Sequence, residues 1–260
     1  MAERSAECGD PIASSVPWPI AVTPTDDPGR TMLEPSTRLR HPSAGETSLF
    51  LVRHGRTSGN RRRLLQGVKD VPLDAVGRDQ ARRVAARLAS EPVVDAIISS
   101  PLRRARTTAS IIGRELGLTP AIAPNLIEMD FGQYEGTRFE TMAIERPDLA
   151  ERFLNIEDYE VAWPGGEARG NFYTRVSRAF EEILRQYESH RIVVVAHGGV
   201  FGAFLAMLEG RSPNDLTVYD LENCGVTHLH VGPNHTVLHY RNDVAHLDAR
   251  EYAETVGGGG

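Results

Sequence analysis

Cysteine, long apolar runs and excess positive charge are scarce or missing in this sequence. The 260 residues contain two cysteines, Cys8 and Cys224, so a structural disulfide is not expected and a reducing compartment is the default. No apolar run approaches the roughly 20 residues that a membrane-spanning helix needs. The N-terminus carries acidic residues and prolines where a secretory signal has an apolar core. These absences predict a cytoplasmic protein that does not contact a membrane.

The charge balance argues against nucleic acid as a partner. The formal net charge is −6, whereas a general nucleic-acid binder usually shows a basic footprint. Hydrophobic residues make up 40% and charged residues 25% of the chain, which is ordinary for a globular protein. Arginines do cluster locally, so the average leaves room for one positive pocket.

Composition divides the chain into a domain and two tails. Residues 1–46 are rich in Pro, Ser, Thr and Asp without apolar periodicity, which predicts a flexible N-terminal arm. Residues 251–260 end in a run of glycines and predict a flexible C-terminal tail. Residues 47–250 are expected to form one domain, with segment 138–166 as a small helical cap.

Strand patterns alternate with helix patterns through the domain. Apolar runs predict strands, periodic apolar faces predict helices, and Gly232-Pro233-Asn234 predicts the turn of a hairpin. Such alternation implies an α/β fold, a three-layer α/β/α sandwich with a mostly parallel central sheet. The expected strands are 48–52, 95–100 and 191–197, the expected helices are 77–90, 101–116, 171–187 and 198–210, and the expected hairpin is 226–242.

Two apolar runs end in a His-Gly pair. The run "SLFLVRHGRTSGN" (48–60) leads into His54, and "RIVVVAHGGV" (191–200) leads into His197. Ligands of parallel sheets bind beyond the carboxyl ends of the strands, where both histidines are expected. Glycine after each histidine lets backbone approach a ligand closely, and the start of the helix after Gly198 favours an anion.

Basic residues are predicted at the same edge of the sheet. Arg53 precedes His54, Asn60 follows in the loop, and Arg103 and Arg104 come shortly after a predicted strand. Guanidinium groups fit phosphoryl oxygens with two parallel hydrogen bonds. Arginines, two histidines and an amide therefore predict a phosphate pocket. No cluster of acidic metal ligands and no phosphate-loop lysine accompanies them, so neither a metal nor a cofactor is expected.

The segment around His54, "LVRHGRTSGN", resembles the RHG signature of the histidine phosphatase superfamily, also called phosphoglycerate-mutase-like. The resemblance covers roughly residues 48–247, and its ordered motifs make it far more specific than one tripeptide. The other motifs are "LLQGVKDVPLDAVGRDQA", "SSPLRRARTTA", "LIEMDFGQYEG", "WPGGEA" and "VVVAHGGV".

The resemblance implies a role for each matching residue. His54 matches the nucleophile that becomes phosphohistidine, and Glu128 matches the proton donor. Gly198 matches a backbone amide that binds phosphate. The other matches, to groups around the transferring phosphate, are Arg53, Asn60, Arg104 and His197.

The implied chemistry is physically consistent. Nearby arginines should lower the pKa of His54 and keep its imidazole neutral and nucleophilic. Burial beside phosphate should raise the pKa of Glu128, so that its carboxylic acid can protonate the departing alkoxide and later take a proton from water. The sequence therefore predicts a metal-independent hydrolase of a small phosphorylated metabolite.

Two other functions and one other assembly stay open. A phosphoglycerate-type mutase returns the phosphoryl group to a bound sugar acid, but the compact segment between Glu128 and His197 favours a phosphatase. A protein that binds a phosphorylated ligand without turnover is a further alternative. A homodimer is an open alternative to a monomer.

Several neighbours of the motifs are weaker candidates. Arg56 stands where family members commonly carry Glu or Gln, and we expect it to point into water. Gly59 replaces a frequent tryptophan, which predicts a more open pocket wall. Glu135 and Glu167 could act in the site or cap a helix, and Gln66 could shape the loop.

Two groups of side chains have alternative interpretations. His228 and His230 share one face of a strand, as metal ligands could, but without carboxylates at suitable spacing we expect surface strand residues. The apolar residues of the cap could meet a ring-bearing leaving group, but packing in the cap's own small core is the preferred interpretation. They are Phe139, Met142, Phe153, Tyr159 and Trp163.

Overall fold

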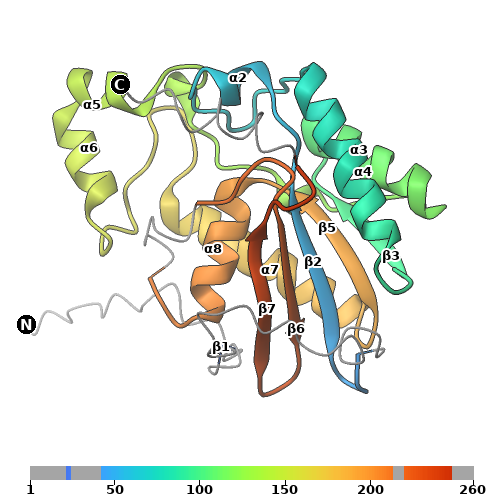
Figure 1. The fold of residues 1–260 in the computed structure, drawn as a ribbon. Coiled ribbons are helices and arrows are strands. Elements are labelled where there is room, and N and C mark those ends of the chain that lie inside the picture. The colour runs from blue at the N-terminus through green and yellow to red at the C-terminus, as the bar shows by residue number, and fades with distance from the viewer. Residues whose placement is uncertain (1–21, 25–41, 213–219, 248–260) are drawn as a thin grey trace, which may run out of the picture.

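A seven-stranded sheet lies at the centre of the protein (Figure 1). The structure, a computed structural model, describes residues 22–24, 42–212 and 220–247. Among the described strands β6 alone runs opposite to the others, so the sheet is mostly parallel, as predicted. In spatial order the strands are β1 (Val22–Pro24), β7 (Thr236–Asp243), β6 (Val226–Val231), β2 (Thr47–Arg53), β5 (Arg191–Ala196), β3 (Ala96–Ser99) and β4 (Ala121–Ile122).

The two central strands bring both His-Gly pairs to one edge of the sheet. Every residue of β5 is buried, as a strand covered on both faces requires. The register pairs Arg53 of β2 with Ala196 of β5, and the His54 N–H donates to the Ala196 carbonyl at 3.0 Å. His54 and His197 each follow the last residue of their strand, so their backbones begin side by side.

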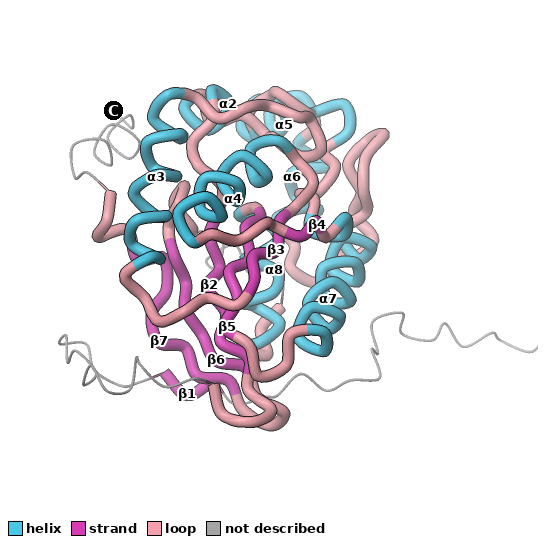
Figure 2. Tube along the Cα trace, turned by 90° about the vertical axis from the view of Figure 1, so that its right-hand side faces the viewer, coloured by secondary structure: helices cyan, strands magenta, loops and turns pink. Residues whose placement is uncertain are grey.

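Helices cover both faces of the sheet, which confirms the predicted three-layer sandwich (Figures 1 and 2). Alternate residues of β2 enter two separate cores, with Phe50 and Val52 on one face and Leu49 and Leu51 on the other. The first core is closed by α3 (Ala75–Ala89) and α4 (Arg103–Leu116), and the second by α7 (Arg169–Gln186) and α8 (Gly198–Leu208).

Helix α4 begins two residues later than the sequence pattern suggests. Its first residue is Arg103 and its N-cap is Leu102, so Pro101, which was expected in the first turn, precedes the helix. Gly117 ends the helix with a left-handed φ of 69°, a conformation that glycine adopts at little cost. Arg104 is consequently in the first turn of α4, just beyond the end of β3.

Segment 138–166 contains two helices, α5 (Phe139–Glu145) and α6 (Pro147–Leu154). Both lie at the end of the sheet where α2 (Ser58–Arg61) also lies, which is the end that carries the histidines (Figures 1 and 2). The cap has a core of its own, and Tyr159 packs against the main core instead. The buried members of the cap core are Met142, Leu149, Ala150, Phe153, Val161 and Trp163.

Most of the predicted arm and tail lies outside the described residues. Within the arm, residues 22–24 form β1 and pair in parallel with β7. None of the helices in the described part of the chain is long and apolar enough to cross a membrane.

Candidate active site

A cavity of about 220 Å³ opens at the carboxyl ends of β2 and β5. Five of the seven predicted site residues line it, and the other two, Arg104 and His197, are completely buried. The five are Arg53, His54, Asn60, Glu128 and Gly198.

His54 is held as a neutral imidazole with a defined tautomer. Its Nδ1 lies 2.8 Å from the Gly55 carbonyl, so Nδ1–H donates there and the lone pair is left on Nε2. Burial lowers the pKa of His54 well below its ordinary value, and the charges of Arg104 and Arg53 lower it further. Asn223 donates to the His54 carbonyl at 2.8 Å and fixes the backbone.

His197 faces His54 across the site. The two ring centroids are 5.2 Å apart. Nε2 of His197 lies 2.7 Å from the Ser100 hydroxyl, which also accepts from the Leu102 N–H at 3.4 Å. The Ser100 hydroxyl therefore donates to Nε2, and the single N–H of the neutral ring is on Nδ1. Burial first, and then Arg104, lowers the pKa of His197 well below its ordinary value.

Three buried nitrogens at this site have no hydrogen-bond partner among the described residues: Nε of Arg53, Nε of Arg104 and Nδ1 of His197. Buried polar groups are nearly always paired, so a ligand with several acceptor oxygens suits this place. Both guanidiniums are otherwise anchored, since Arg53 donates to the Leu221 carbonyl and Arg104 donates to Lys69 O at 2.9 Å. Burial lowers the pKa of Arg104 to about 10, which still leaves it charged at neutral pH.

Glu128 is a buried carboxyl fixed by backbone. One oxygen accepts from the Met129 N–H and the other from the Gly199 N–H, each at 3.0 Å. Burial raises the pKa of Glu128, and this outweighs the two hydrogen bonds and the nearby arginines. Arg175 donates to the Ile127 carbonyl at 2.9 Å and pairs with Glu167 at 2.8 Å, so the segment that carries Glu128 is tied to α7.

Asn60 is committed in part to its own helix. Its Oδ1 accepts from the Thr57 N–H at 3.0 Å and its own backbone N–H donates to the Thr57 hydroxyl at 3.1 Å, which completes a capping box at the start of α2. Only its amide N–H groups are left to contact an anion, which is the polarity that a phosphate requires.

The weaker candidates have structural positions. Arg56 does not point into water as expected, because it is only 11% exposed in its side chain and pairs with Asp74 at 3.0 Å. The wall beside Gly59 is not open either, since a Cβ there would collide with Gln66. Gln66 in turn accepts from the Thr57 hydroxyl at 2.6 Å.

Neither Glu135 nor Glu167 gives its carboxylate to the start of an α-helix in the described residues, although the Glu135 backbone ends the short 3-10 helix at 132–134. Glu135 accepts from the Val68 and Lys69 N–H groups at 2.8 and 3.0 Å, and it thereby shapes the loop whose carbonyls hold Arg104. Glu167 is the partner of Arg175. Both carboxylates therefore support the positions of other site residues.

The histidines of the hairpin form a cluster, although His228 and His230 were expected to be surface residues of a strand. His228 is buried, stacks on Phe50 at 4.1 Å and lies 3.0 Å from the Ser48 hydroxyl. A register shift between β6 and β7 leaves His239 between the partners of His228 and Leu229, and the ligand atoms of His228, His230 and His239 lie within 4.8 Å of one another. However, the rings of His228 and His239 are stacked, 22° from parallel. Lone pairs lie in the ring plane, so these two rings do not aim at one ion as they stand.

Fold and site together define a phosphoryl-transfer protein of the histidine type, with two neutral imidazoles, two arginines and a buried carboxyl in or beside one cavity. The chain belongs to the histidine phosphatase superfamily (branch 1), whose family model matches residues 49–244. The predicted family is therefore confirmed.

Named relatives include both phosphatases and mutase-like proteins. Phosphoglycerate mutase-like protein 4 of Arabidopsis thaliana is 34% identical over 215 residues, which cover 81% of this chain and 91% of the relative. Metal-independent phosphoserine phosphatase of the same plant is 31% identical over 206 residues, which cover 78% of this chain and 84% of the relative. A solved phosphoserine phosphatase from Entamoeba histolytica, in complex with phosphoserine, has a TM-score of 0.68 and 28% identity, covering 78% of this chain and all of the other.

Proposed function

We propose that the protein hydrolyses small phosphomonoesters through a phosphohistidine at His54. The observation that carries the proposal is the placement of His54 and His197, 5.2 Å apart, beside a cavity that Glu128 also lines. Hydrolases with phosphatase names recur among the relatives, which supports hydrolysis over simple binding.

In the first step Nε2 of His54 attacks phosphorus. The bond from phosphorus to the ester oxygen breaks, and the Glu128 carboxyl gives its proton to that oxygen, so the alcohol leaves neutral. Arg53, Arg104 and His197 supply donors to the phosphoryl oxygens, whose charge must be held in the transition state. The Gly198 N–H adds to these donors at the positive end of α8.

In the second step water attacks the phosphohistidine. The Glu128 carboxylate takes a proton from the water, the bond from phosphorus to Nε2 breaks, and the electron pair returns to His54. Inorganic phosphate is released and the carboxyl is protonated again, so the cycle closes. The raised pKa of Glu128 suits both roles, because the group must give and take a proton near the working pH.

A mutase would use the same first step and then pass the phosphoryl group to a second sugar acid. Isomerisation of 3-phosphoglycerate, followed by chromatography of the products, separates the two activities. Release of inorganic phosphate from an ester without isomerisation supports the hydrolase. The cytoplasmic location and a homodimer remain proposals, the second of which gel filtration with light scattering tests directly.

Phosphate release from p-nitrophenyl phosphate should be unchanged in excess EDTA. Glu128 is the one carboxylate among the described residues that line the phosphate cavity, and both its oxygens already accept N–H groups. Divalent metals prefer several carboxylate or carbonyl oxygens, and this cavity does not offer such a set. A metal-dependent phosphatase assayed in parallel controls for chelation. Loss of activity that Zn²⁺ or Mg²⁺ restores would contradict the prediction.

Gly199→Ala should lower kcat/KM for an alkyl phosphate by about 10²-fold, because displacing a catalytic group by about 1 Å has that effect. A Cβ at this residue would collide with Oε1 of Glu128. Gly198→Ala is the matched control, since its Cβ would only approach the Arg53 side chain at 3.5 Å and its N–H is kept. Kinetics on both variants should show a much smaller loss for Gly198→Ala, and equal losses would refute the steric argument.

A further inference from the structure

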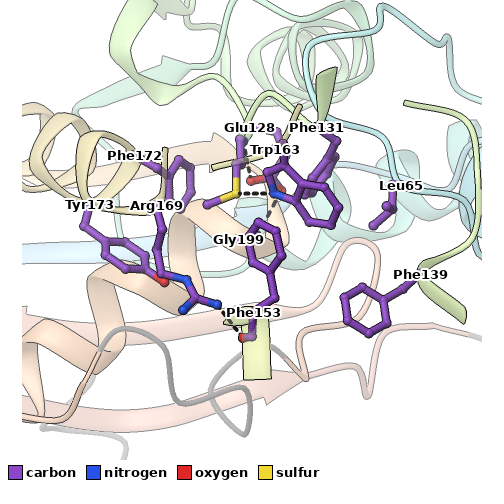
Figure 3. Close-up of a pocket in the computed structure, with 11 residues that line it drawn as sticks. Leu65, Glu128, Phe131, Phe139, Phe153, Trp163, Arg169, Phe172, Tyr173 and Gly199 are labelled. Atoms are coloured by element: carbon purple, nitrogen blue, oxygen red, sulfur yellow. Dashed lines mark hydrogen bonds between the residues drawn. The ribbon is translucent and has the colours of Figure 1, made fainter. Parts of the chain in front are cut away.

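A second cavity adjoins the phosphate cavity. It has a volume of about 310 Å³ and is bounded by α7 and the cap (Figure 3). The two cavities share four lining residues, so they lie directly next to each other. The shared residues are Leu65, Glu128, Phe131 and Gly199.

Glu128 at the junction orients a phosphomonoester. When phosphorus is next to His54 in the first cavity, the proton donor must be within hydrogen-bond reach of the ester oxygen. A donor at the junction requires the ester oxygen there as well, and the second cavity is then the adjoining space for the rest of the alcohol. The side chains of the second cavity accordingly select the leaving group.

The wall of the second cavity is aromatic. Trp163 stacks on Phe153 with centroids 4.1 Å apart and meets Phe131 edge-on at 5.1 Å (Figure 3). The Trp163 N–H is directed to the Met129 sulfur at 3.1 Å. Phe139 also lines this cavity and packs against the cap core that contains Phe153 and Trp163 (Figure 3). The cap aromatics thus belong to the cap core and also line the second cavity.

The second cavity offers little to a charged leaving group. Arg169 is the one cation among its described lining residues. Its guanidinium donates to the main-chain carbonyls of Asn155, Asp158 and Phe153, so it holds α6 and the following turn to α7. Arg169 already uses three of its five N–H groups on these carbonyls. A carboxylate in this cavity would therefore meet Glu128 and a cation that is largely committed to the main chain, and an unpaired buried charge is costly.

We propose that the natural leaving group is an uncharged alcohol with an aromatic or similarly apolar body. The inference rests on the proposed hydrolysis, and it names the substrate class that the second cavity fits. Its volume lies at the lower end of the range for small-molecule sites, which suits a ring system rather than a long chain.

The test compares two alkyl esters, 2-phenylethyl phosphate and O-phospho-L-serine. Both release an alkoxide that needs a proton, so the comparison isolates the body of the leaving group. We expect kcat/KM, measured as phosphate release, to be at least about 10²-fold higher for the phenylethyl ester. Equal values, or a preference for phosphoserine, overturn the inference while leaving hydrolysis intact. If neither ester releases phosphate, the proposed hydrolase function is overturned as well.

A positive charge introduced into the second cavity should shift the substrate preference towards phosphoserine. Phe139→Arg places a guanidinium at the first residue of α5, and we expect the ratio of kcat/KM values to fall by at least about 10-fold in favour of phosphoserine. Ile144→Arg in the same helix is the matched control, because Ile144 is 83% exposed, and its ratio should equal that of the unchanged protein. An unchanged ratio in a folded Phe139→Arg protein contradicts the proposed location of the leaving group.

Discussion

Replacement of His54 by alanine is expected to reduce kcat/KM for every phosphomonoester by a factor on the order of 10⁴ or more, as the loss of an enzymatic nucleophile does. Nε2 of His54 is the atom proposed to form the bond to phosphorus, and alanine offers no substitute. The surrounding structure should survive, because the Asn223 amide bonds to the main-chain carbonyl of residue 54 rather than to the ring. Phosphate release measures kcat/KM, and circular dichroism shows whether the fold of the variant is kept.

The covalent step itself gives the sharper readout. Rapid quenching with a ³²P-labelled ester should yield protein-bound label that is stable to alkali and labile to acid, and His54→Ala should yield none. His190→Ala is the matched control, because His190 is exposed just before β5 and lies outside the cavity lining. Near-normal turnover in His54→Ala would falsify the assignment of the nucleophile.

Glu128→Gln should lower kcat/KM for 2-phenylethyl phosphate by about 10²- to 10³-fold, within the range expected for a lost general acid. The same change should lower kcat/KM for p-nitrophenyl phosphate much less, because p-nitrophenolate is a stabilised anion and leaves without a proton. Here kcat/KM is the right constant, since it reports bond cleavage and excludes the later attack by water. Equal losses for the two esters would remove Glu128 from the role of proton donor.

The pH profile gives the same residue a second readout. Burial raises the pKa of Glu128, and only its protonated form can act as an acid, so kcat/KM for an alkyl ester should fall as pH rises through that pKa. The pKa of His54 is lowered, so loss of its neutral form should be confined to pH well below 6.5. Glutamine does not titrate, and the Glu128→Gln profile should lack the limb at higher pH. Substrate ionisation is common to both profiles and cancels.

The sequence predicts the site well where a local pattern coincides with a strand end. The apolar runs before His54 and His197 define β2 and β5, and parallel pairing then places both residues at one edge. Arg104 and Glu128 follow from motifs of the family rather than from periodicity. Five of the seven predicted residues line one cavity, and the other two, Arg104 and His197, are buried outside its lining; their roles remain predictions.

The supporting residues escape sequence analysis because their partners are distant in the chain. Ser100 meets His197 across 97 positions, and Asn223 meets the His54 carbonyl across 169. Neither residue type carries a signal of its own, since serine and asparagine are common in loops. The prediction that Arg56 points into water is wrong for a related reason, because its ion pair with Asp74 depends on the packing of two loops against each other.

The unpaired nitrogens of Arg53, Arg104 and His197 have a consequence for the end of the reaction. In the proposed reaction these nitrogens would donate to oxygens that remain on phosphorus, so they would distinguish poorly between the ester and the free phosphate that hydrolysis leaves behind. Once the alcohol has left, the anion still satisfies donors that would otherwise be buried without partners. We therefore expect inorganic phosphate to inhibit the reaction as a product, and we expect its release to compete with the chemical steps as the slow event.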